Sequence, residues 1–447
     1  MDSMLEWSRA AWRRHLPNVP DINGFVRGLG DGTIHGLAHA TALASPDKLA
    51  IRIGDETITH GELDALAAQH RRSIKAGDRV LLAAPPSIKW VAEYLGILQA
   101  GGVVVPANPA YTAAELDAIV QASRSASWKE RDGSDAVALL AFTSGTTGKP
   151  KPVPLTHRNL LTSIRVAMAA WQWSADDVLV HALPLFHQHG LGGLNATLIA
   201  GSSLHLLPRF APEELLRATE KATVLFAVPT MYQRLEGRSG NRLRLCISGS
   251  APLSSGVAKH AEEVLGRAPL VRYGTTESGL DTSQVISDPP ADTVGIPLPG
   301  IELRLGEDGE IHLRGPQVAA AFVDSDGWFR TGDLGRIDEA TGHLVIDGRA
   351  KEMIITGGMK VYPREVEVAL EAHPDVAEAA VAGVASERWG EQVTAWVVMK
   401  PGIAFDADRL IEHAGTLLAP YKRPKEIKRV ESLPRNHVGK IDRRELR

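Results

Sequence analysis

The 447 residues carry 49 lysines and arginines against 53 aspartates and glutamates, a formal net charge of −4, and 44% of them are hydrophobic. A chain of this length exceeds what one hydrophobic core usually serves, so we expect two or more domains. Because no basic excess is present to neutralise phosphates along a nucleic acid, the composition excludes a general polyanion binder and predicts no nucleic-acid partner.

The single cysteine, Cys246, excludes an intrachain disulfide and a thiolate metal cluster, and it favours the reducing cytoplasm as the location. No apolar stretch approaches the roughly 18–20 residues that a membrane-spanning helix needs, so no integral membrane association is expected. Residues 1–17 lack the apolar centre of a signal peptide. Their apolar residues instead predict a short amphipathic helix that packs on its own protein.

The middle of the chain alternates apolar runs with helical patterns, which is typical of βαβ units and a parallel sheet. The predicted strands span residues 79–84, 102–106, 223–228, 243–248 and 270–273. The helices predicted between them span residues 88–100, 212–221 and 255–266. These patterns predict a large α/β body.

From about residue 295 the pattern changes to short alternating strands with turns, at residues 301–305, 310–314 and 343–346, which predicts a small β subdomain. A second shift follows near residue 347. After it we predict helices at 363–372 and 407–418 and strands at 376–384 and 392–398. We therefore predict a multi-subdomain N-terminal α/β domain over residues 1–349 and a C-terminal α+β lid domain over residues 350–447.

The loop after the apolar run at residues 137–142 combines glycines, hydroxyls and lysines. Glycine lets backbone N–H groups turn toward an anion, and hydroxyls and ammonium groups add donors and charge. The residues predicted to bind phosphate are Thr143, Ser144, Gly145, Thr146, Thr147, Gly148, Lys149 and Lys151. The loop is not a Walker A motif, because Thr143 and Pro150 stand where that motif needs Gly and Ser or Thr. The plain alternative is a surface loop with two solvated lysines.

Three further segments carry groups suited to a nucleotide. Residues 273–277 (Tyr-Gly-Thr-Thr-Glu) follow a predicted strand, where an aromatic ring can stack on a base and Glu277 offers the hard oxygen that Mg²⁺ prefers. The predicted turn at residues 327–333 presents Asp333, which suits the two hydroxyls of a ribose. Near the C-terminus, a short loop presents Lys440. Taken singly, these are also compatible with a capped turn, an ordinary turn aspartate and a solvated lysine.

In this order, and together with residues 347–349, Gly357, Gly358 and the segment 363–365, these motifs match the acyl-adenylate-forming (ANL) superfamily over almost the whole chain. That superfamily contains acyl-CoA synthetases, adenylation domains and luciferases. The resemblance implies a two-step ligase that uses ATP, Mg²⁺ and coenzyme A. A carboxylate attacks the α-phosphate of MgATP to give acyl-AMP and pyrophosphate, and the thiol of CoA then displaces AMP.

The resemblance also implies a role for each motif residue. The loop would hold the β- and γ-phosphates, Thr276 the α-phosphate, Glu277 the Mg²⁺, and Asp333 with Arg349 the ribose. Lys440 would contact the α-phosphate and the carboxylate oxygen and so offset the charge that develops there. The residues implied for adenine are Gly249, Ser250, Ala251, Tyr273 and Gly274.

A mobile C-terminal domain is implied as well, with Lys351 at the hinge and Gly357 and Gly358 moving toward the CoA tunnel between the two half-reactions. Two departures from the family pattern stand out. Pro152 replaces a usual glycine and stiffens the exit of the phosphate loop, and the short link at residues 122–136 indicates a trimmed peripheral subdomain. Neither departure removes a reacting group.

The segment 184–190 limits the choice of substrate acid. It has no aspartate to pair with the ammonium group of an amino acid, so an amino acid is not the expected substrate. This segment, with residues 171–177 and Arg272, looks most like the malonyl-CoA synthetases, in which the matching arginine takes the distal carboxylate of malonate. His189 and Thr275 are the other predicted substrate-binding residues. Thr275 replaces a usual methionine, which indicates a wider or more polar pocket. His187 and His189 have no companion ligand nearby, so the pair does not predict a metal site.

The resemblance therefore predicts an acyl-CoA synthetase for a small dicarboxylic acid such as malonate or methylmalonate, acting as a monomer or homodimer. In one alternative, Arg272 forms an intramolecular salt bridge and the protein is an aryl- or medium-chain acyl-CoA ligase. In another, the protein is a non-catalytic nucleotide-binding protein that kept the fold.

Overall fold

The computed structural model describes residues 2–144, 150–240, 242–287, 292–435 and 441–446. The chain divides into two compact units: unit 1 is Met1–Arg304, His312–Arg330 and Thr341–His343, and unit 2 is Leu305–Ile311, Thr331–Ala340 and Leu344–Arg447. The predicted large α/β body and smaller C-terminal domain are confirmed. The boundary between residues 349 and 350 and the mobility of the lid stay predictions.

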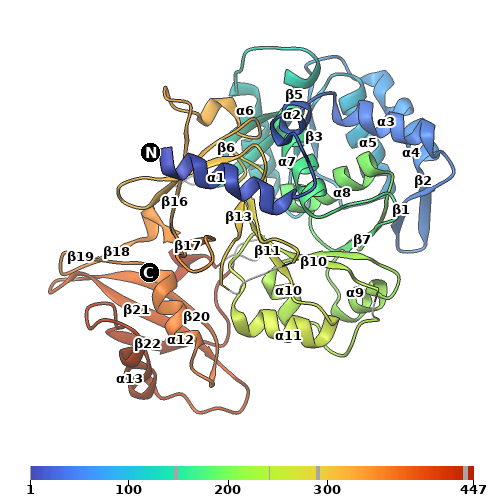
Figure 1. Ribbon diagram of the computed structural model, residues 1–447. Helices are drawn as coiled ribbons and strands as arrows, with labels where there is room; N and C mark the ends of the chain where they lie inside the picture. Colours follow the sequence, from blue (N-terminus) through green and yellow to red (C-terminus); the bar gives the residue numbers. More distant parts are fainter. Residues whose placement is uncertain (1, 145–149, 241, 288–291, 436–440, 447) are drawn as a thin grey trace. The chain divides into compact units, whose positions relative to one another are not determined.

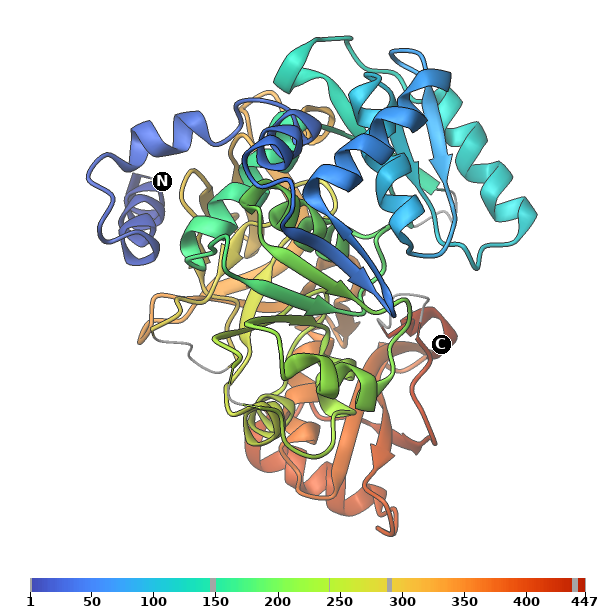
Figure 2. The ribbon, with the colours of Figure 1, turned by 90° about the vertical axis from the view of Figure 1, so that its right-hand side faces the viewer.

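A nine-stranded sheet is the largest sheet of unit 1 (Figures 1 and 2). In spatial order its strands are β13 (Ile296–Pro297), β12 (Thr282–Ser283), β11 (Leu270–Tyr273), β10 (Leu245–Ser248), β9 (Val224–Ala227), β7 (Val178–His181), β8 (Ser203–Leu206), β1 (Leu49–Ile53) and β2 (Glu56–Thr59). The six strands from β11 to β1 run parallel to one another. Every residue of β9 and β10 is buried, as expected for parallel strands covered on both faces. Loops after β7, β10 and β11 therefore leave the sheet at one shared edge.

A second sheet in unit 1 has the order β3-β4-β5-β6. Its strands are β3 (Arg79–Leu82), β4 (Val103–Pro106), β5 (Val137–Ser144) and β6 (Pro150–Thr156). Along the edge strand β6, three prolines alternate with other residues and pair with Ser144, Phe142 and Leu140. Proline is tolerated at an edge because its missing N–H can face away from the partner strand, and three of them at alternate positions block further pairing.

The helices of unit 1 cover these sheets. They are α1 (Asp2–His15), α2 (Ile22–Gly28), α3 (Ile34–Ala44), α4 (His60–His70), α5 (Ile88–Gln99), α6 (Ala113–Ser125), α7 (His157–Ala170), α8 (Gln188–Ala200), α9 (Pro212–Thr219), α10 (Pro229–Gln233) and α11 (Ser255–Leu265). The predicted N-terminal helix is confirmed, and its Trp12 Nε1 donates to the carbonyl oxygen of Ile301 at 3.0 Å. Over the described residues, every helix is too short or too polar to cross a membrane.

A third sheet contains β14 (Glu302–Leu305), β15 (Glu310–Arg314), β16 (Phe329–Ile337) and β17 (Leu344–Arg349), and the division between the units falls within these strands. The prediction of a turn at residues 327–333 was wrong for most of that segment, because β16 begins at Phe329. Gly332 has a φ of +72°, which favours glycine. The strand nevertheless continues, and Asp333 pairs with Arg349 of β17.

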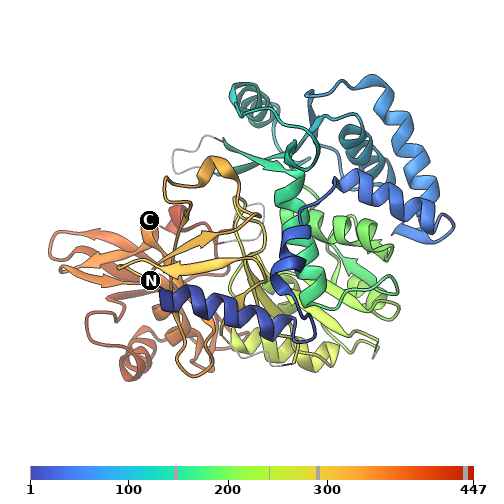
Figure 3. The same ribbon diagram turned by 45° about the horizontal axis from the view of Figure 1, so that its top comes forward.

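Unit 2 is built on a sheet of β18 (Ile354–Thr356), β19 (Met359–Val361), β20 (Val376–Ser386), β21 (Gly390–Met399) and β22 (Glu426–Arg429), shown in orange and red in Figure 3. Helices α12 (Pro363–Glu371) and α13 (Ala407–Leu417) cover one face. Their Leu370 and Leu410 share a hydrophobic core with Val381 and Val393 of the sheet. The alternate residues of β20 and β21 point to the other face, where Trp396 packs with Leu446.

Candidate active site

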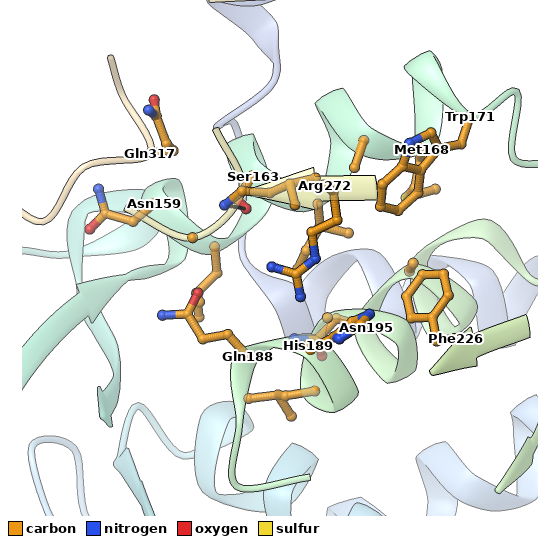
Figure 4. A pocket seen from close by; sticks show the side chains of 18 of the residues that line it. Asn159, Ser163, Met168, Trp171, Gln188, His189, Asn195, Phe226, Arg272 and Gln317 are labelled. Atoms are coloured by element: carbon orange, nitrogen blue, oxygen red, sulfur yellow. Dashed lines mark hydrogen bonds between the residues drawn. The ribbon is translucent and has the colours of Figure 1, made fainter. Parts of the chain in front are cut away.

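A cavity of about 60 Å³ lies at the shared edge of the parallel strands in unit 1 (Figure 4). Residues of α7 and α8 form much of its wall, joined by Phe226 of β9 and Arg272 of β11. The apolar part of the wall includes Trp171, Met168 and Phe226, which Figure 4 places on one side. Among the described residues of its lining, the cavity thus combines one cation with largely apolar side chains.

The guanidinium of Arg272 projects into this cavity in Figure 4. A Cβ at residue 249 would lie only 2.5 Å from Arg272 Nε, so Gly249 makes room for the side chain. The side chain of Arg272 forms no hydrogen bond and no ion pair with any described residue. Burial lowers the pKa of Arg272 to about 10, although the charge of Asp281 acts in the opposite direction. The alternative of an intramolecular salt bridge therefore finds no partner among the described residues.

Asp281 is the acidic group whose charge acts on Arg272, but its own hydrogen bonds lie elsewhere. It accepts hydrogen bonds from Ser278 Oγ and, at 3.1 Å, from Gln317 Nε2. Burial raises the pKa of Asp281 to about 7, against the opposing effects of these two bonds and of Arg272. Because the carboxyl group is engaged and only weakly acidic, it compensates the guanidinium charge incompletely.

His189 lines the cavity from the first turn of α8. Its ring packs against Phe226, with ring centroids 5.2 Å apart, and its Nδ1 lies 3.5 Å from Ser250 Oγ. Burial and the nearby charge of Arg272 hold the pKa of His189 well below its usual value, so the ring is neutral and carries one N–H donor. Its Nε2 has no hydrogen-bond partner in the described part of the chain. His189 and Arg272, both predicted to bind substrate, therefore line the same cavity.

The first segment predicted to bind adenine begins directly after β10. Ser250 adopts a φ of +70°, a conformation that costs free energy in a residue with a side chain and that clusters at functional sites. Ala251 follows it in the same loop. Tyr273 ends β11, so the two predicted adenine-binding segments leave neighbouring parallel strands at the same edge.

The turn after Tyr273 is held tightly. A Cβ at Gly274 would lie 1.9 Å from the carbonyl oxygen of Gly279, so only glycine fits there. Thr275 Oγ1 lies 3.0 Å from Ser278 Oγ and accepts a hydrogen bond from the Ser278 backbone N–H at 3.2 Å. Thr275 therefore caps this turn, and it is not among the residues that line the cavity.

Thr276 and Glu277 lie in the same turn, between Thr275 and Ser278. Gln188 Nε2 donates to the carbonyl oxygen of Thr276 at 2.5 Å, which links the turn to α8. The Glu277 carboxylate forms no hydrogen bond or ion pair with any described residue. No group of three His, Cys, Asp or Glu that could hold a metal ion occurs in the described ranges. A lone carboxylate fits Mg²⁺, which protein sites often hold through one or two carboxylates plus substrate phosphates.

The predicted phosphate loop connects β5 to β6. Thr143 pairs with Lys151 and Ser144 with Pro150, so the loop is the connection of an antiparallel hairpin. Lys151 Nζ lies 4.7 Å from the centroid of the Phe322 ring. The remaining predicted loop residues lie outside the described residues, and so does Lys440: they are Gly145, Thr146, Thr147, Gly148 and Lys149.

Unit 2 carries the predicted ribose and hinge residues. Arg349 Nε and Asp333 Oδ1 lie 2.9 Å apart, so the two predicted ribose ligands form an ion pair. Lys351 is exposed in a short 3₁₀ turn. Gly357 and Gly358 connect β18 to β19 with φ values of +57° and +80°. Left-handed values at two successive positions explain why both residues are glycines.

Sequence reasoning missed several residues of the cavity, Asn195 and Met168 among them. The helical period places Gly192 and Ala196, three and seven positions after His189, on the face of His189, and both line the cavity. Asn195, six positions after His189, lies about 120° round the helix from it, so this period does not select Asn195.

Comparisons with known proteins identify the family of the chain. The model of the AMP-binding enzyme family matches residues 38–128 and 125–323, and that of the AMP-binding enzyme C-terminal domain matches residues 365–440. The mitochondrial malonate–CoA ligase ACSF3 of Mus musculus is 33% identical over 77% of this chain and 69% of its own length. A Mycobacterium tuberculosis protein, 3-[(3aS,4S,7aS)-7a-methyl-1,5-dioxo-octahydro-1H-inden-4-yl]propanoyl:CoA ligase, is 34% identical over 90% of this chain and 96% of its own.

Among solved structures, the ATP-bound MatB of Rhodopseudomonas palustris superimposes with a TM-score of 0.84. It is 34% identical, and the match covers 92% of this chain and 98% of that one. Enzymes of this family use ATP, Mg²⁺ and CoA. The chain belongs to the AMP-binding enzyme family, within the acyl-adenylate-forming superfamily, and is an AMP-forming acyl-CoA synthetase that resembles the malonyl-CoA synthetases.

Proposed function

We propose that this enzyme converts a small dicarboxylic acid, of the size of malonate or methylmalonate, into its CoA thioester. The observation that carries the proposal is the guanidinium of Arg272, which lines a cavity without an ion-pair partner among the described residues. A cation withdrawn from water is costly unless an anion accompanies it. The distal carboxylate of a dicarboxylic acid supplies that anion and matches the planar fork of a guanidinium.

The size of the cavity is compatible with the same substrate class. A volume of about 60 Å³ has room for the few heavy atoms of a small acid. The relative ACSF3 is a malonate–CoA ligase, whereas the Mycobacterium tuberculosis relative takes a much larger acid at a similar identity. Identity to relatives therefore does not select the acid, and the proposal depends on the cation in the cavity.

In the proposed reaction, one carboxylate of the substrate attacks the α-phosphate of ATP while Arg272 holds the other. Thr276 contacts the α-phosphate, and Glu277 would hold a Mg²⁺, which would neutralise phosphate charge. Asp333 and Arg349 bind the ribose, and Lys440 offsets the charge on the reacting oxygens. The residues proposed for adenine and the outer phosphates are Gly249, Ser250, Ala251, Tyr273, Gly274, Lys149 and Lys151.

Thioester formation follows a rotation of residues 350–447 about Lys351, which brings Gly357 and Gly358 toward the CoA thiol. This rotation lets one active site serve both half-reactions. Thr275 shapes the pocket indirectly, through the turn that it caps with Ser278. The cytoplasmic location and the oligomeric state, monomer or homodimer, stay predictions.

The proposal is tested by mass spectrometry of the thioesters that form when purified enzyme, MgATP and CoA meet equimolar malonate, methylmalonate, acetate, octanoate and a hydroxycinnamate. We expect malonyl-CoA or methylmalonyl-CoA to dominate. Octanoyl- or hydroxycinnamoyl-CoA as the main product would overturn the proposal and favour an aryl- or medium-chain acyl-CoA ligase, for which the apolar wall formed by Trp171, Met168 and Phe226 would be the recognition surface.

A further inference from the structure

Besides Arg272 and His189, Asn195 is a polar residue of the cavity wall with an atom that lacks a partner among the described residues. Asn195 lies on α8, is 1% exposed and lines the same cavity as Arg272. Its Oδ1 accepts a hydrogen bond from the hydroxyl of Tyr94 at 3.1 Å. Its Nδ2 has no hydrogen-bond partner in the described part of the chain. An unsatisfied buried donor is costly, so its retention in a cavity wall indicates that a ligand completes it.

The hydroxyl of Tyr94 determines which polar atom of the Asn195 amide stays without a hydrogen bond. It lies on α5, is 1% exposed and stacks on Trp90 with ring centroids 5.7 Å apart. Burial raises the pKa of Tyr94, so its hydroxyl keeps its proton and needs an acceptor. The Asn195 carbonyl oxygen is that acceptor. With the oxygen held by Tyr94, only the N–H₂ group of Asn195 remains for another partner.

The surrounding helix face leaves space for such a partner. His189, Gly192 and Asn195 follow one another at intervals of three along α8, and all three line the cavity. A Cβ placed on Gly192 would meet no atom within 4 Å, so the face is open between the two polar residues. Figure 4 shows the guanidinium of Arg272 reaching from β11 toward the helix that carries His189 and Asn195.

We infer that Asn195 is a substrate-binding residue that donates through Nδ2 to the distal carboxylate held by Arg272, and that Tyr94 is the positioning residue that orients this amide. The inference rests on the proposed dicarboxylate function. A carboxylate has enough acceptor sites to take hydrogen bonds from the guanidinium and the amide together. A monocarboxylic acid would place an alkyl or aryl group there and leave both donors unsatisfied, so the pair selects against it.

The test compares steady-state kinetics of wild-type enzyme with Asn195→Leu and Asn195→Asp, using malonate as the probe and varying ATP separately. Asn195→Leu removes the donor at similar size, and we expect the KM for malonate to rise about 10- to 100-fold while the KM for ATP is unchanged. In Asn195→Asp, the new carboxylate still accepts the hydrogen bond from the Tyr94 hydroxyl, but it places a negative charge beside the substrate carboxylate. It should lower kcat/KM for malonate further than Asn195→Leu.

Thr197→Val is the matched control. Thr197 is a fully buried residue of the same helix whose Oγ1 also lacks a partner among the described residues, but it does not line the cavity. Its substitution should leave the KM for malonate within about twofold of wild type. A rise equal to that of Asn195→Leu would show that any polar change in α8 acts through the fold, and the inference would be overturned.

Tyr94→Phe tests the positioning role, because it removes one oxygen and keeps the stacked ring. We expect a smaller rise in the KM for malonate, about 3- to 10-fold, with kcat and the KM for ATP unchanged. In the double variant with Asn195→Leu, the loss of the Tyr94 hydroxyl should add nothing, because the amide it orients is gone. Fully additive effects of the two substitutions would contradict the assigned role.

The products of the wild-type enzyme distinguish a failure of the proposed function from a failure of the role assigned to Asn195. If it makes malonyl-CoA but Asn195→Leu and Asn195→Asp keep the wild-type KM for malonate, the role of Asn195 is wrong and the proposed function stands. If wild-type enzyme makes no dicarboxylic thioester, the proposed function fails, and the inference fails with it.

Discussion

Two largely enclosed arginine side chains, Arg443 in unit 2 and Arg272 in unit 1, differ in the partners that the chain gives them. In unit 2, Arg443 donates to Glu367 at 2.6 Å, to Glu352 at 3.1 Å and to the carbonyl oxygen of Val381 at 3.1 Å. In unit 1, the guanidinium of Arg272 has no hydrogen bond or ion pair with any described residue.

The pKa values of the two arginines shift in opposite directions. Burial acts to lower the pKa of both groups, but Glu367 and Glu352 outweigh it at Arg443 and raise that pKa, whereas the pKa of Arg272 falls to about 10. A guanidinium that serves only the fold is thus neutralised by carboxylates of the chain itself. A guanidinium without such partners is available to an anion from outside, and the difference between the two sites indicates a binding role for Arg272.

The largest effect on stability is expected at Arg443. Replacing it with alanine leaves the carboxylate of Glu367, whose side chain is 2% exposed, without its main cationic partner. Breaking such a buried pair costs roughly 3–5 kcal/mol of unfolding free energy. Urea denaturation followed by tryptophan fluorescence measures the loss.

Arg409→Ala is the control for that measurement. Arg409 pairs with Asp375 at 3.0 Å, but its side chain is 60% exposed, so its loss should cost less than about 1 kcal/mol. Equal losses for the two substitutions would remove the contrast between enclosed and exposed pairs on which the comparison depends.

Arg272→Met should behave in the opposite way to Arg443→Ala. Methionine has a similar length and no charge, so the variant without ligand should melt at or above the wild-type temperature, because an uncompensated cation has been removed. Malonate at 100 times its Kd should raise the melting temperature of wild type, corresponding to about 2.7 kcal/mol, and leave the variant unmoved. Differential scanning fluorimetry with and without malonate measures both. A destabilised variant would mean that Arg272 serves the fold, as Arg443 does.

A smaller effect depends on pH and on Asp281. Its pKa is raised in the folded protein to about 7, so its contribution to stability is fully present below its unfolded value near 3.8 and is lost as the pH rises through 7. Asp281→Asn removes this dependence. Between pH 4 and pH 8, the melting temperature of the variant should therefore gain about 2–5 °C relative to wild type. A constant difference across this range would show that Asp281 is ionised throughout and compensates Arg272 more fully than inferred.

The sequence predicted much of the body and part of the site, for reasons visible in particular residues. Strands β9 and β10 were recognised because parallel strands buried on both faces are continuous apolar runs. Arg272 and His189 were predicted to bind substrate because the motifs around them resemble those of the malonyl-CoA synthetases.

Other features depend on contacts that no local pattern contains. Asn195 was missed because its orientation comes from Tyr94, which is 101 positions away in the sequence. The segment from Phe329 to Asp333 was interpreted as a turn because of its glycine and aspartate, but pairing with β17 keeps it a strand. The same pairing places Asp333 against Arg349, which the spacing of the two residues along the chain could not indicate.

The most direct test of the account is the ratio of kcat/KM for malonate to that for butyrate, measured side by side for wild type and Arg272→Met with ATP and CoA saturating. Butyrate lacks the distal carboxylate, and the account predicts a wild-type ratio well above one that falls about 100- to 1,000-fold in the variant, corresponding to roughly 3–4 kcal/mol for a lost charge pair. An unchanged ratio, or a wild type that prefers butyrate, would show that Arg272 does not bind the substrate carboxylate.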